Sequence, residues 1–205
     1  MTVAAVILVP DNGLALVDAD GEPAIRRIVQ SAWSGGAIPI VIVGRGLDES
    51  PGPTDGIRVA IADLQATLSE PGADEPQGIA WFAHGLGSAL AAVSDTTAAL
   101  LWPVRYCWVD PETATSLIEA HGDHPETILR PSYRGEPGFP ILVPIGVGDQ
   151  LAAQSGLHAP DAIEALAAAG VPLETMELGD PGIAVDSATP RSALAAYQGP
   201  PRRER

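Results

Sequence analysis

A segment in the second half of the chain combines an aromatic ring, a guanidinium and two glycines: Tyr133, Arg134, Gly135 and Gly138. Glycine lets a ligand approach the backbone closely, because it has no side chain in the way. A guanidinium can bind a phosphate through two parallel hydrogen bonds. The segment is therefore a candidate site for a phosphorylated ligand. The alternative is a turn kept for folding, with Phe139 packed in the core.

His84 is a second candidate for ligand contact. It follows the apolar run Ile79–Phe82, which we interpret as a strand, and precedes Gly85 and Gly87, which resemble the start of a helix. Clefts in α/β proteins form where strands end, although a lone histidine is often structural. Ser88 lacks the G-x-S-x-G context of a nucleophile, so helix packing explains it better. Metal-ligand spacing on one helix face is absent among the other histidines, which are His121, His124 and His158.

The charge balance limits the partners of these sites. The formal net charge is -15, with 26 acidic residues against 11 basic ones, and every basic residue is an arginine. Nucleic acid is not expected as a partner, because its binding depends on basic residues that neutralise phosphates. A nucleotide could still be bound by a few arginines in one cleft, but not by a lysine. A high-GC genome would explain the replacement of lysine by arginine without a functional cause.

Length and cysteine content favour one soluble domain in the cytoplasm. The 205 residues suit a single α/β domain over residues 1–198, followed by a frayed tail over residues 199–205. No apolar run approaches the ~20 residues that span a bilayer, so we expect no membrane partner. Ala4–Val9 is apolar but follows no basic segment, so we interpret it as a strand rather than a signal peptide. Cys107 has no second cysteine to pair with, which is typical of a reducing compartment.

Short apolar runs alternate with helical patterns along the chain, which predicts βαβ units and a mostly parallel sheet. The runs are continuous, as in strands that are covered on both faces. The predicted strands are Ala4–Val9, Ile38–Val43, Ile79–Phe82, Ala98–Val104, Ile141–Pro144 and Pro172–Glu177. Two exposed loops, over residues 44–55 and 69–77, are predicted from their prolines and glycines.

Helices are predicted from apolar positions that repeat on one face and from capping residues. They span Pro23–Trp33, Gly56–Leu68, a segment that follows Asp110, Asp161–Ala169, and a last segment from Pro190 through Tyr197. Asp110 is a predicted N-cap, because a proline and a glutamate follow it in the first turn. Gly170 is the predicted C-cap of its helix.

Six segments, in order, resemble the MobA/MocA family of nucleotidyltransferases, which attach CMP or GMP to molybdopterin. They cover nearly the whole chain: Val6–Leu8, Asp20–Pro23, His84–Leu90, Pro103–Thr113, Pro131–Pro140 and Asp186–Pro190. The resemblance implies a three-layer αβα sandwich with a Rossmann-like sheet, of the nucleotide-diphospho-sugar transferase type. It places the ligand cleft at the carboxyl ends of the strands. It also implies a nucleotide or pterin-like ligand, with Mg²⁺ and CTP or GTP as cofactors if the family activity survives.

The segment after the first strand departs from the family pattern. The family cradles the triphosphate with a loop of the form "AAGxSxRMG" and a following lysine, whereas the loop here has one glycine and no basic residue. Asn12 and Gly13 are its candidate ligand contacts. Pro10, however, lacks an N–H, and Asp11 adds negative charge where the phosphates would lie. An intact phosphate cradle is therefore not expected.

The expected metal site departs from the pattern as well. Alignment with the family puts Arg105 at the position of a metal-binding aspartate, and a guanidinium cannot bind Mg²⁺. Asp186 keeps one carboxylate of the second metal motif, while the other position is Ala188. Asp186 is thus the one metal candidate; the alternative is a solvated or capping acid. We expect Arg105 and Asp186 to form an ion pair, because a buried guanidinium without a carboxylate is strongly penalised.

Three hypotheses about function follow from the resemblance and the departures. The first is a degenerate member that binds a ligand or partner without nucleotidyl transfer. The second is an active transferase with a remodelled site, in which Arg105, Arg130 or Arg134 replaces the lost cations. The third is a structural subunit that pairs through exposed Trp or Tyr residues as a homo-oligomer. The candidate ligand contacts are Asn12, Gly13, His84, Arg105, Tyr133, Arg134, Gly135 and Gly138.

Overall fold

The computed structural model describes residues 1–47 and 55–199. Most of the predicted loop 44–55, and the predicted tail beyond residue 199, lie outside these described residues. The strands are β1 (Thr2–Val9), β2 (Asp18–Ala19), β3 (Glu22–Pro23), β4 (Ile40–Gly44), β5 (Thr67–Ser69), β6 (Thr96–Pro103), β7 (Ile128–Tyr133), β8 (Glu136–Pro137), β9 (Ile141–Pro144) and β10 (Leu173–Glu177). The α-helices are α1 (Asn12–Ala15), α2 (Ala24–Ser34), α3 (Asp55–Ile61), α4 (Ile79–Ala92), α5 (Pro111–Asp123), α6 (Gly148–Ala152) and α7 (Ala159–Ala168).

The main sheet of the described residues has eight strands, in the order β10-β7-β9-β6-β1-β4-β5, with β8 paired to β7. β1 is parallel to β4 on one side and to β6 on the other, so the first strand lies inside the sheet. β5 is parallel to β4, and β10 is parallel to β7. β9 runs antiparallel between β6 and β7, and β8 is antiparallel to β7. The predicted mostly parallel sheet is confirmed.

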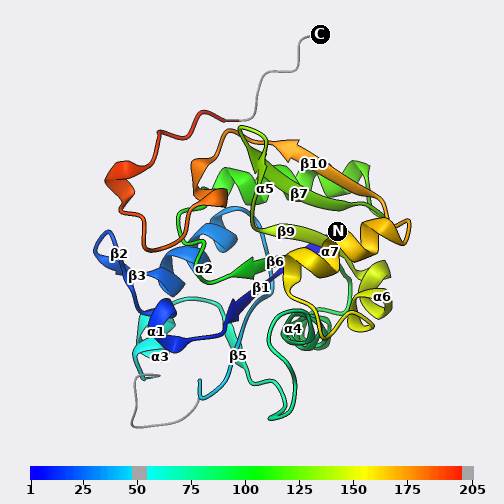
Figure 1. The fold of residues 1–205 in the computed structure, drawn as a ribbon. Coiled ribbons are helices and arrows are strands. Elements are labelled where there is room, and N and C mark those ends of the chain that lie inside the picture. Colours follow the sequence, from blue (N-terminus) through cyan, green and yellow to red (C-terminus); the bar gives the residue numbers. More distant parts are fainter. Residues whose placement is uncertain (48–54, 200–205) are drawn as a thin grey trace.

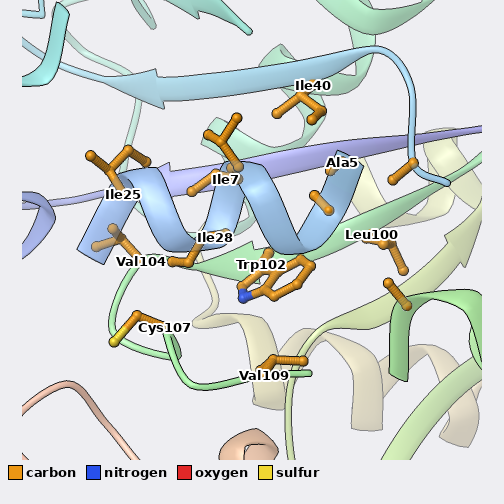
Figure 2. Packing of buried hydrophobic residues seen from close by; sticks show 14 of the residues in the cluster. Ala5, Ile7, Ile25, Ile28, Ile40, Leu100, Trp102, Val104, Cys107 and Val109 are labelled. Carbon is orange, nitrogen blue, oxygen red and sulfur yellow. The ribbon is translucent and has the colours of Figure 1, made fainter. Parts of the chain in front are cut away.

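Helices cover both faces of this sheet and create three layers, as Figure 1 shows. Successive side chains of a strand point to opposite faces, so Ile7 enters one core and Val6 the other. The first core contains apolar residues of α2, α3 and α5, and the second those of α4, α6 and α7. In the first core, Ile25 and Ile28 of α2 pack beside Ile7 and Trp102 (Figure 2). The predicted three-layer αβα architecture is confirmed.

Capping residues set the helix ends as the sequence predicts. The Asp110 carboxylate accepts the N–H of Glu112 at 3.0 Å and caps α5. Gly170, with φ of 94°, follows the end of α7.

Within the described residues, no helix has both the length and the apolar character that crossing a membrane requires.

The predicted strand over residues 79–82 is wrong, because this segment is the first turn of α4. Ile79, Phe82, Leu86 and Ala89 are buried at helical spacing along α4. A short apolar run has the same appearance in a buried helix and in a buried strand, so periodicity over four residues cannot separate them.

Two predicted helices are also shorter than expected. The helix predicted to reach Leu68 ends at Ile61, and the residues that follow turn back to form the edge strand β5. The last predicted helix is a single 3-10 turn over Arg191–Ala193. Strand β7 was not predicted, because Arg130 and Pro131 interrupt its apolar pattern.

Candidate functional site

A cavity of about 410 Å³, here called the cleft, lies at the carboxyl edge of the sheet. Leu8 near the end of β1 and Pro103 at the end of β6 line it, and so do the segments that lead into α4 and α7. Open α/β sheets bind ligands at this edge. The other side chains that the cleft uses are Gln77, Trp81, Arg105, Tyr106, Phe139 and His158.

Aromatic rings form much of the cleft wall. Trp81 is 1% exposed, and the rings of Tyr106 and Phe139 stack with their centroids 4.9 Å apart. The indole N–H of Trp81 donates to the Glu75 carbonyl at 3.3 Å, and the Arg45 guanidinium lies 5.4 Å from the Trp81 ring centroid. These contacts fix the rings before a ligand binds. Such a wall suits a ligand with a planar ring.

Arg105 supplies positive charge to the cleft. It is exposed, and within the described residues its guanidinium forms no ion pair. The predicted ion pair with Asp186 is therefore wrong: Asp186 is exposed, and its Oδ1 accepts the N–H of Ala188 at 3.0 Å. The reason is that Arg105 is solvated, so it needs no carboxylate to balance it. Its guanidinium can pair with an anionic ligand.

The residues at this edge do not fit Mg²⁺, the ion that the family resemblance implies. No three side chains of His, Cys, Asp or Glu gather to hold a metal in the part of the chain that the structure describes. Asp186, the predicted metal candidate, caps its own turn. Mg²⁺ needs oxygen ligands in an octahedron, and Arg105 stands where the alignment places an acid. These residues therefore support no reaction step through a metal.

In the loop between β1 and α1, a carboxylate of the chain already accepts one backbone N–H. Asp11 Oδ1 accepts the N–H of Gly13 at 2.7 Å and caps α1. The Asn12 side chain points to another loop, where Nδ2 donates to the Arg45 carbonyl at 3.3 Å. In many nucleotide sites, the first N–H groups of a helix bind phosphate. Here a carboxylate takes that position, and its charge repels a phosphate.

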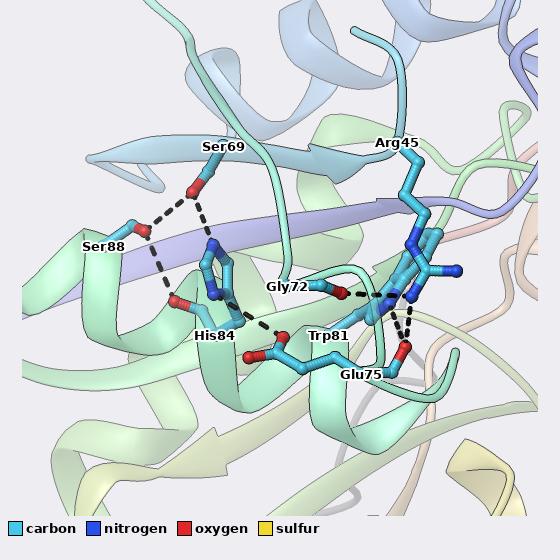
Figure 3. Close-up of polar contacts among 7 residues, drawn as sticks. All are labelled: Arg45, Ser69, Gly72, Glu75, Trp81, His84 and Ser88. Atoms are coloured by element: carbon cyan, nitrogen blue, oxygen red, sulfur yellow. Dashed lines mark hydrogen bonds and ion pairs between the residues drawn. The ribbon is translucent and has the colours of Figure 1, made fainter.

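His84 lies in the middle of α4, not between a strand and a helix as predicted, because residues 79–92 are all helical. It is not among the residues that line the cleft. His84 Nε2 lies 2.9 Å from Ser69 Oγ, and His84 Nδ1 lies 3.7 Å from Glu75 Oε2 (Figure 3). Ser69 Oγ is also 2.9 Å from Ser88 Oγ.

This serine–histidine–glutamate order resembles that of a catalytic triad, but its surroundings point to a structural role. Neither Ser69 nor His84 lines the cleft. The Ser69 hydroxyl also forms a hydrogen bond with the hydroxyl of Ser88. The network joins β5, the segment 70–78 and α4. Arg45 strengthens it by donating to the Glu75 carbonyl at 2.6 Å. The network therefore positions the segment that carries Gln77 into the cleft wall.

Tyr133, Arg134 and Gly135 belong to the turn of the β7–β8 hairpin. Arg134 and Gly135 have φ of 53° and 83°, the backbone of a tight hairpin turn. Their N–H groups donate to the Glu177 carboxylate at 2.8 and 3.2 Å, and the Arg134 guanidinium lies 5.1 Å from the Tyr133 ring centroid. Burial favours a raised pKa for Glu177, but these N–H bonds and the Ser132 hydroxyl outweigh it and lower that pKa. The chain itself thus occupies these backbone donors.

Gly138 has a packing role. A Cβ at this position would lie 2.2 Å from the Ile183 carbonyl oxygen, so only glycine fits without movement of the backbone. The next residue, Phe139, is 8% exposed and forms part of the cleft wall. The observed contacts therefore agree with a turn kept for folding, the alternative that the sequence offered.

Asp180 was not found from the sequence, although it organises the loop after β6. It is 2% exposed, and its two oxygens accept the Asp110 N–H at 2.9 Å, the Thr113 hydroxyl at 2.7 Å and the Gly182 N–H at 2.8 Å. Burial raises the pKa of Asp180, and the three hydrogen bonds oppose that rise. Its position before Pro-Gly is typical of a turn, but this signal does not reveal a partner 70 residues away.

The three-layer fold, with its cleft at the carboxyl edge, defines an open-sheet α/β protein of the kind that binds ligands where strands end. Residues 14–170 match the MobA-like NTP transferase domain family, and the chain belongs to that family. The comparison with curated proteins finds no match.

Three solved structures share the fold. Rv0371c from Mycobacterium tuberculosis H37Rv, solved in complex with manganese, is 19% identical with a TM-score of 0.63, covering 87% of this chain and 88% of that one. Mth528, a nucleotidyl transferase from Methanothermobacter, is 16% identical with a TM-score of 0.64, covering 86% and 87%. The 2-C-methyl-D-erythritol 4-phosphate cytidylyltransferase from Thermus thermophilus is 16% identical with a TM-score of 0.62, covering 90% and 92%.

Proposed function

We propose that the protein binds an anionic ligand with a planar ring, of the nucleotide or pterin type, in the cleft without transferring a nucleotidyl group. One observation carries this proposal: the Asp11 carboxylate accepts the N–H of Gly13 at the start of α1. The donor that would hold a phosphate is thereby capped by an acid of the chain itself.

The cleft wall supports the ligand class. Tyr106 offers preset aromatic surface, which the buried rings of Trp81 and Phe139 support from behind, and Arg105 offers a guanidinium without an ion-pair partner in the described residues. Stacking on aromatic rings recognises a planar ring, and the guanidinium recognises a negative group attached to it. A pterin belongs to this class, which keeps a molybdenum-cofactor ligand within the proposal. The buried, single Cys107 supports a reducing cytoplasm as the compartment.

Nucleotidyl transfer needs more groups than ligand binding does, so the protein can bind a ligand without catalysing transfer. Attack on the α-phosphorus of an NTP needs donors and cations that stabilise the developing charge, and a metal that bridges the substrate and the leaving group. The chain contains no lysine, and Asp11 places a negative charge at the first helix. Loss of one preorganised donor costs about 10²–10³ in rate, and more than one is missing here.

Isothermal titration calorimetry with CTP, GTP and a pterin, each with and without Mg²⁺ or Mn²⁺, tests the proposal. At least one ligand should bind at a single site, and Arg105→Gln should weaken it about tenfold, because a hydrogen bond to a charged group is lost. Arg130→Gln is the matched control, since Arg130 is ion-paired with Glu164 and does not line the cleft. No binding of any ligand, or equal affinity in Arg105→Gln, would contradict the proposal.

A transferase with an arginine-based site is the second candidate. The exposed guanidinium of Arg105 in the cleft favours it, because such a cation can offset phosphate charge. Metal-dependent binding of CTP or GTP, together with release of pyrophosphate, would identify this function instead.

A further inference from the structure

A second cavity, of about 190 Å³, lies between α2 and the loop that follows β6. We call it the arginine pocket; its lining includes Arg27, Ser31, Trp108, Asp110 and Arg191. It shares no lining residue with the cleft. The two arginines come from positions far apart in the sequence, yet both guanidiniums contact one indole ring. Arg27 lies 5.1 Å and Arg191 5.8 Å from the centroid of the Trp108 ring.

The two guanidiniums have no acid partner in residues 1–47 and 55–199. Among the described residues, neither Arg27 nor Arg191 forms an ion pair, although the chain has 26 acidic residues against 11 basic ones. Arg27 donates to the Ala19 carbonyl at 3.3 Å, and no other acceptor contacts it within the described part of the chain. Asp110 is the carboxylate of the lining, and its Oδ1 accepts the Glu112 N–H. The lining therefore keeps a positive balance on a strongly acidic protein.

Two buried donors of this pocket lack an acceptor. Trp108 is 4% exposed, and its Nε1 has no hydrogen-bond partner among the described residues. The Nε of Arg27 is also buried and also has no hydrogen-bond partner among the described residues. Leaving a buried donor unpaired costs free energy, which a ligand acceptor would recover. Burial also raises the pKa of the Cys107 thiol in the lining to about 11, so this group stays neutral and does not repel an anion.

We propose that the arginine pocket binds a small oxyanion, the phosphate or carboxylate group of a compact ligand. Arg27 and Arg191 supply the charge, and the Trp108 indole supplies an N–H donor. An anion in the pocket also offsets the positive charge of both guanidiniums. The cavity is smaller than the ~300 Å³ at which pockets for drug-sized ligands begin, so it fits a compact ligand rather than a nucleotide. This site does not depend on ligand binding in the cleft.

Titration of the full chain with inorganic phosphate and with acetate, at ionic strength held constant by chloride, tests the proposal. Calorimetry should show saturable one-to-one binding of at least one of the two, and the tighter ligand identifies the anion class. Tryptophan emission should change in parallel, and Trp108→Phe should remove that change while weakening binding, because Phe keeps a ring but has no N–H. Binding of neither anion would overturn the proposal.

Charge-removing variants assign the site. Arg27→Gln and Arg191→Gln should each weaken the anion about tenfold or more. Arg45→Gln is the matched control, because Arg45 also lies on a tryptophan ring, at 5.4 Å from Trp81, but outside this pocket. Arg191 is exposed, so its variant should fold even if Arg27→Gln does not, and circular dichroism checks this. Unchanged affinity in a folded Arg191→Gln protein would place the anion elsewhere and overturn the assignment.

Discussion

Two loops at the carboxyl edge of the sheet differ in whether their hydrogen-bond donors are paired within the protein. After β1, the Asp11 carboxylate accepts the N–H of Gly13. After β6, the indole N–H of Trp108 lies beside the guanidinium of Arg27 and has no partner among the residues that the structure describes. A donor that an acid of the chain already holds is not free for a ligand, whereas an unpaired buried donor favours one. The difference indicates that anion recognition in this protein depends on side chains rather than on a backbone cradle.

Acid caps occur at two further points of this edge. Glu177 accepts the N–H groups of Arg134 and Gly135, and Asp180 accepts those of Asp110 and Gly182. Part of the acidic excess of the chain therefore stabilises loops. Removing these caps one at a time shows how much each loop depends on them.

Asp180→Ala should produce the largest effect. The substitution leaves three donors without their acceptor inside the protein, which costs about 3 kcal/mol of unfolding free energy. For a chain of this size we expect a fall in Tm of about 6–12 °C. Thermal and urea unfolding measure it, with the exposed Asp95→Ala as the control. A change in Asp180→Ala no larger than in the control would show that the carboxylate does not hold the loop.

Gly138→Ala should produce the next largest loss of stability. It tests whether a glycine in the β7–β8 region is needed for packing or for its backbone conformation. Its Cβ would meet the Ile183 carbonyl at 2.2 Å, and we expect a loss of about 2–3 kcal/mol. Gly135→Ala is the matched variant: it has open space around it but a φ of 83°, so it should lose about 1 kcal/mol. Urea unfolding compares the two. A larger loss in Gly135→Ala would reverse the assignment of their roles.

The strands of the sheet were largely predictable from the sequence. Continuous apolar runs such as Ala4–Val9 and Ile141–Pro144 are typical of strands that helices cover on both faces of the sheet. The predictions failed where local pattern and tertiary context disagree. The apolar start of α4 resembles a strand, and the end of the segment predicted as α3 pairs with β4 as an edge strand. Neither outcome is visible in a short window of sequence.

The candidate site was less predictable. The alignment with the family placed Arg105 at the carboxyl edge, and the structure puts it in the cleft. The alignment could not show that Arg105 stays solvated. Nor could it show that the Asp180 carboxylate accepts a hydrogen bond from Thr113, 67 residues away in the sequence. The Trp108 pocket was missed because its two arginines come from distant positions, and a pattern of nearby residues cannot reveal such a convergence.

Asp11→Asn should have a smaller effect, on ligand affinity rather than on folding. The amide oxygen can still accept the Gly13 N–H, but the negative charge at the start of α1 is gone. We expect CTP or GTP to bind about two- to fivefold more tightly, the usual size of a charge effect at a helix end. Calorimetry measures it, with Asp18→Asn as the control, since Asp18 also caps one N–H of an exposed turn. Weaker binding in Asp11→Asn would contradict the repulsion that we assign to Asp11.

The smallest expected effect is the pH dependence at Glu177. Its pKa in the folded protein lies below the ordinary value of 4.5, so its contribution to stability is full above that value and is lost as the pH falls through the folded pKa. The difference in unfolding free energy between the wild type and Glu177→Gln should therefore shrink as the pH falls below 4.5. Urea unfolding at a series of pH values measures it. A difference that grows on acidification would mean that the carboxylate does not hold the hairpin.

Release of pyrophosphate from CTP or GTP, in the presence of Mg²⁺ and molybdopterin, tests the central claim most directly. The Asp11 cap and the missing metal ligands predict no release above that of the Arg105→Gln protein, even when calorimetry shows the nucleotide bound. Release at an ordinary enzymatic rate, about 1 s⁻¹ or more, would show that the protein transfers nucleotidyl groups after all.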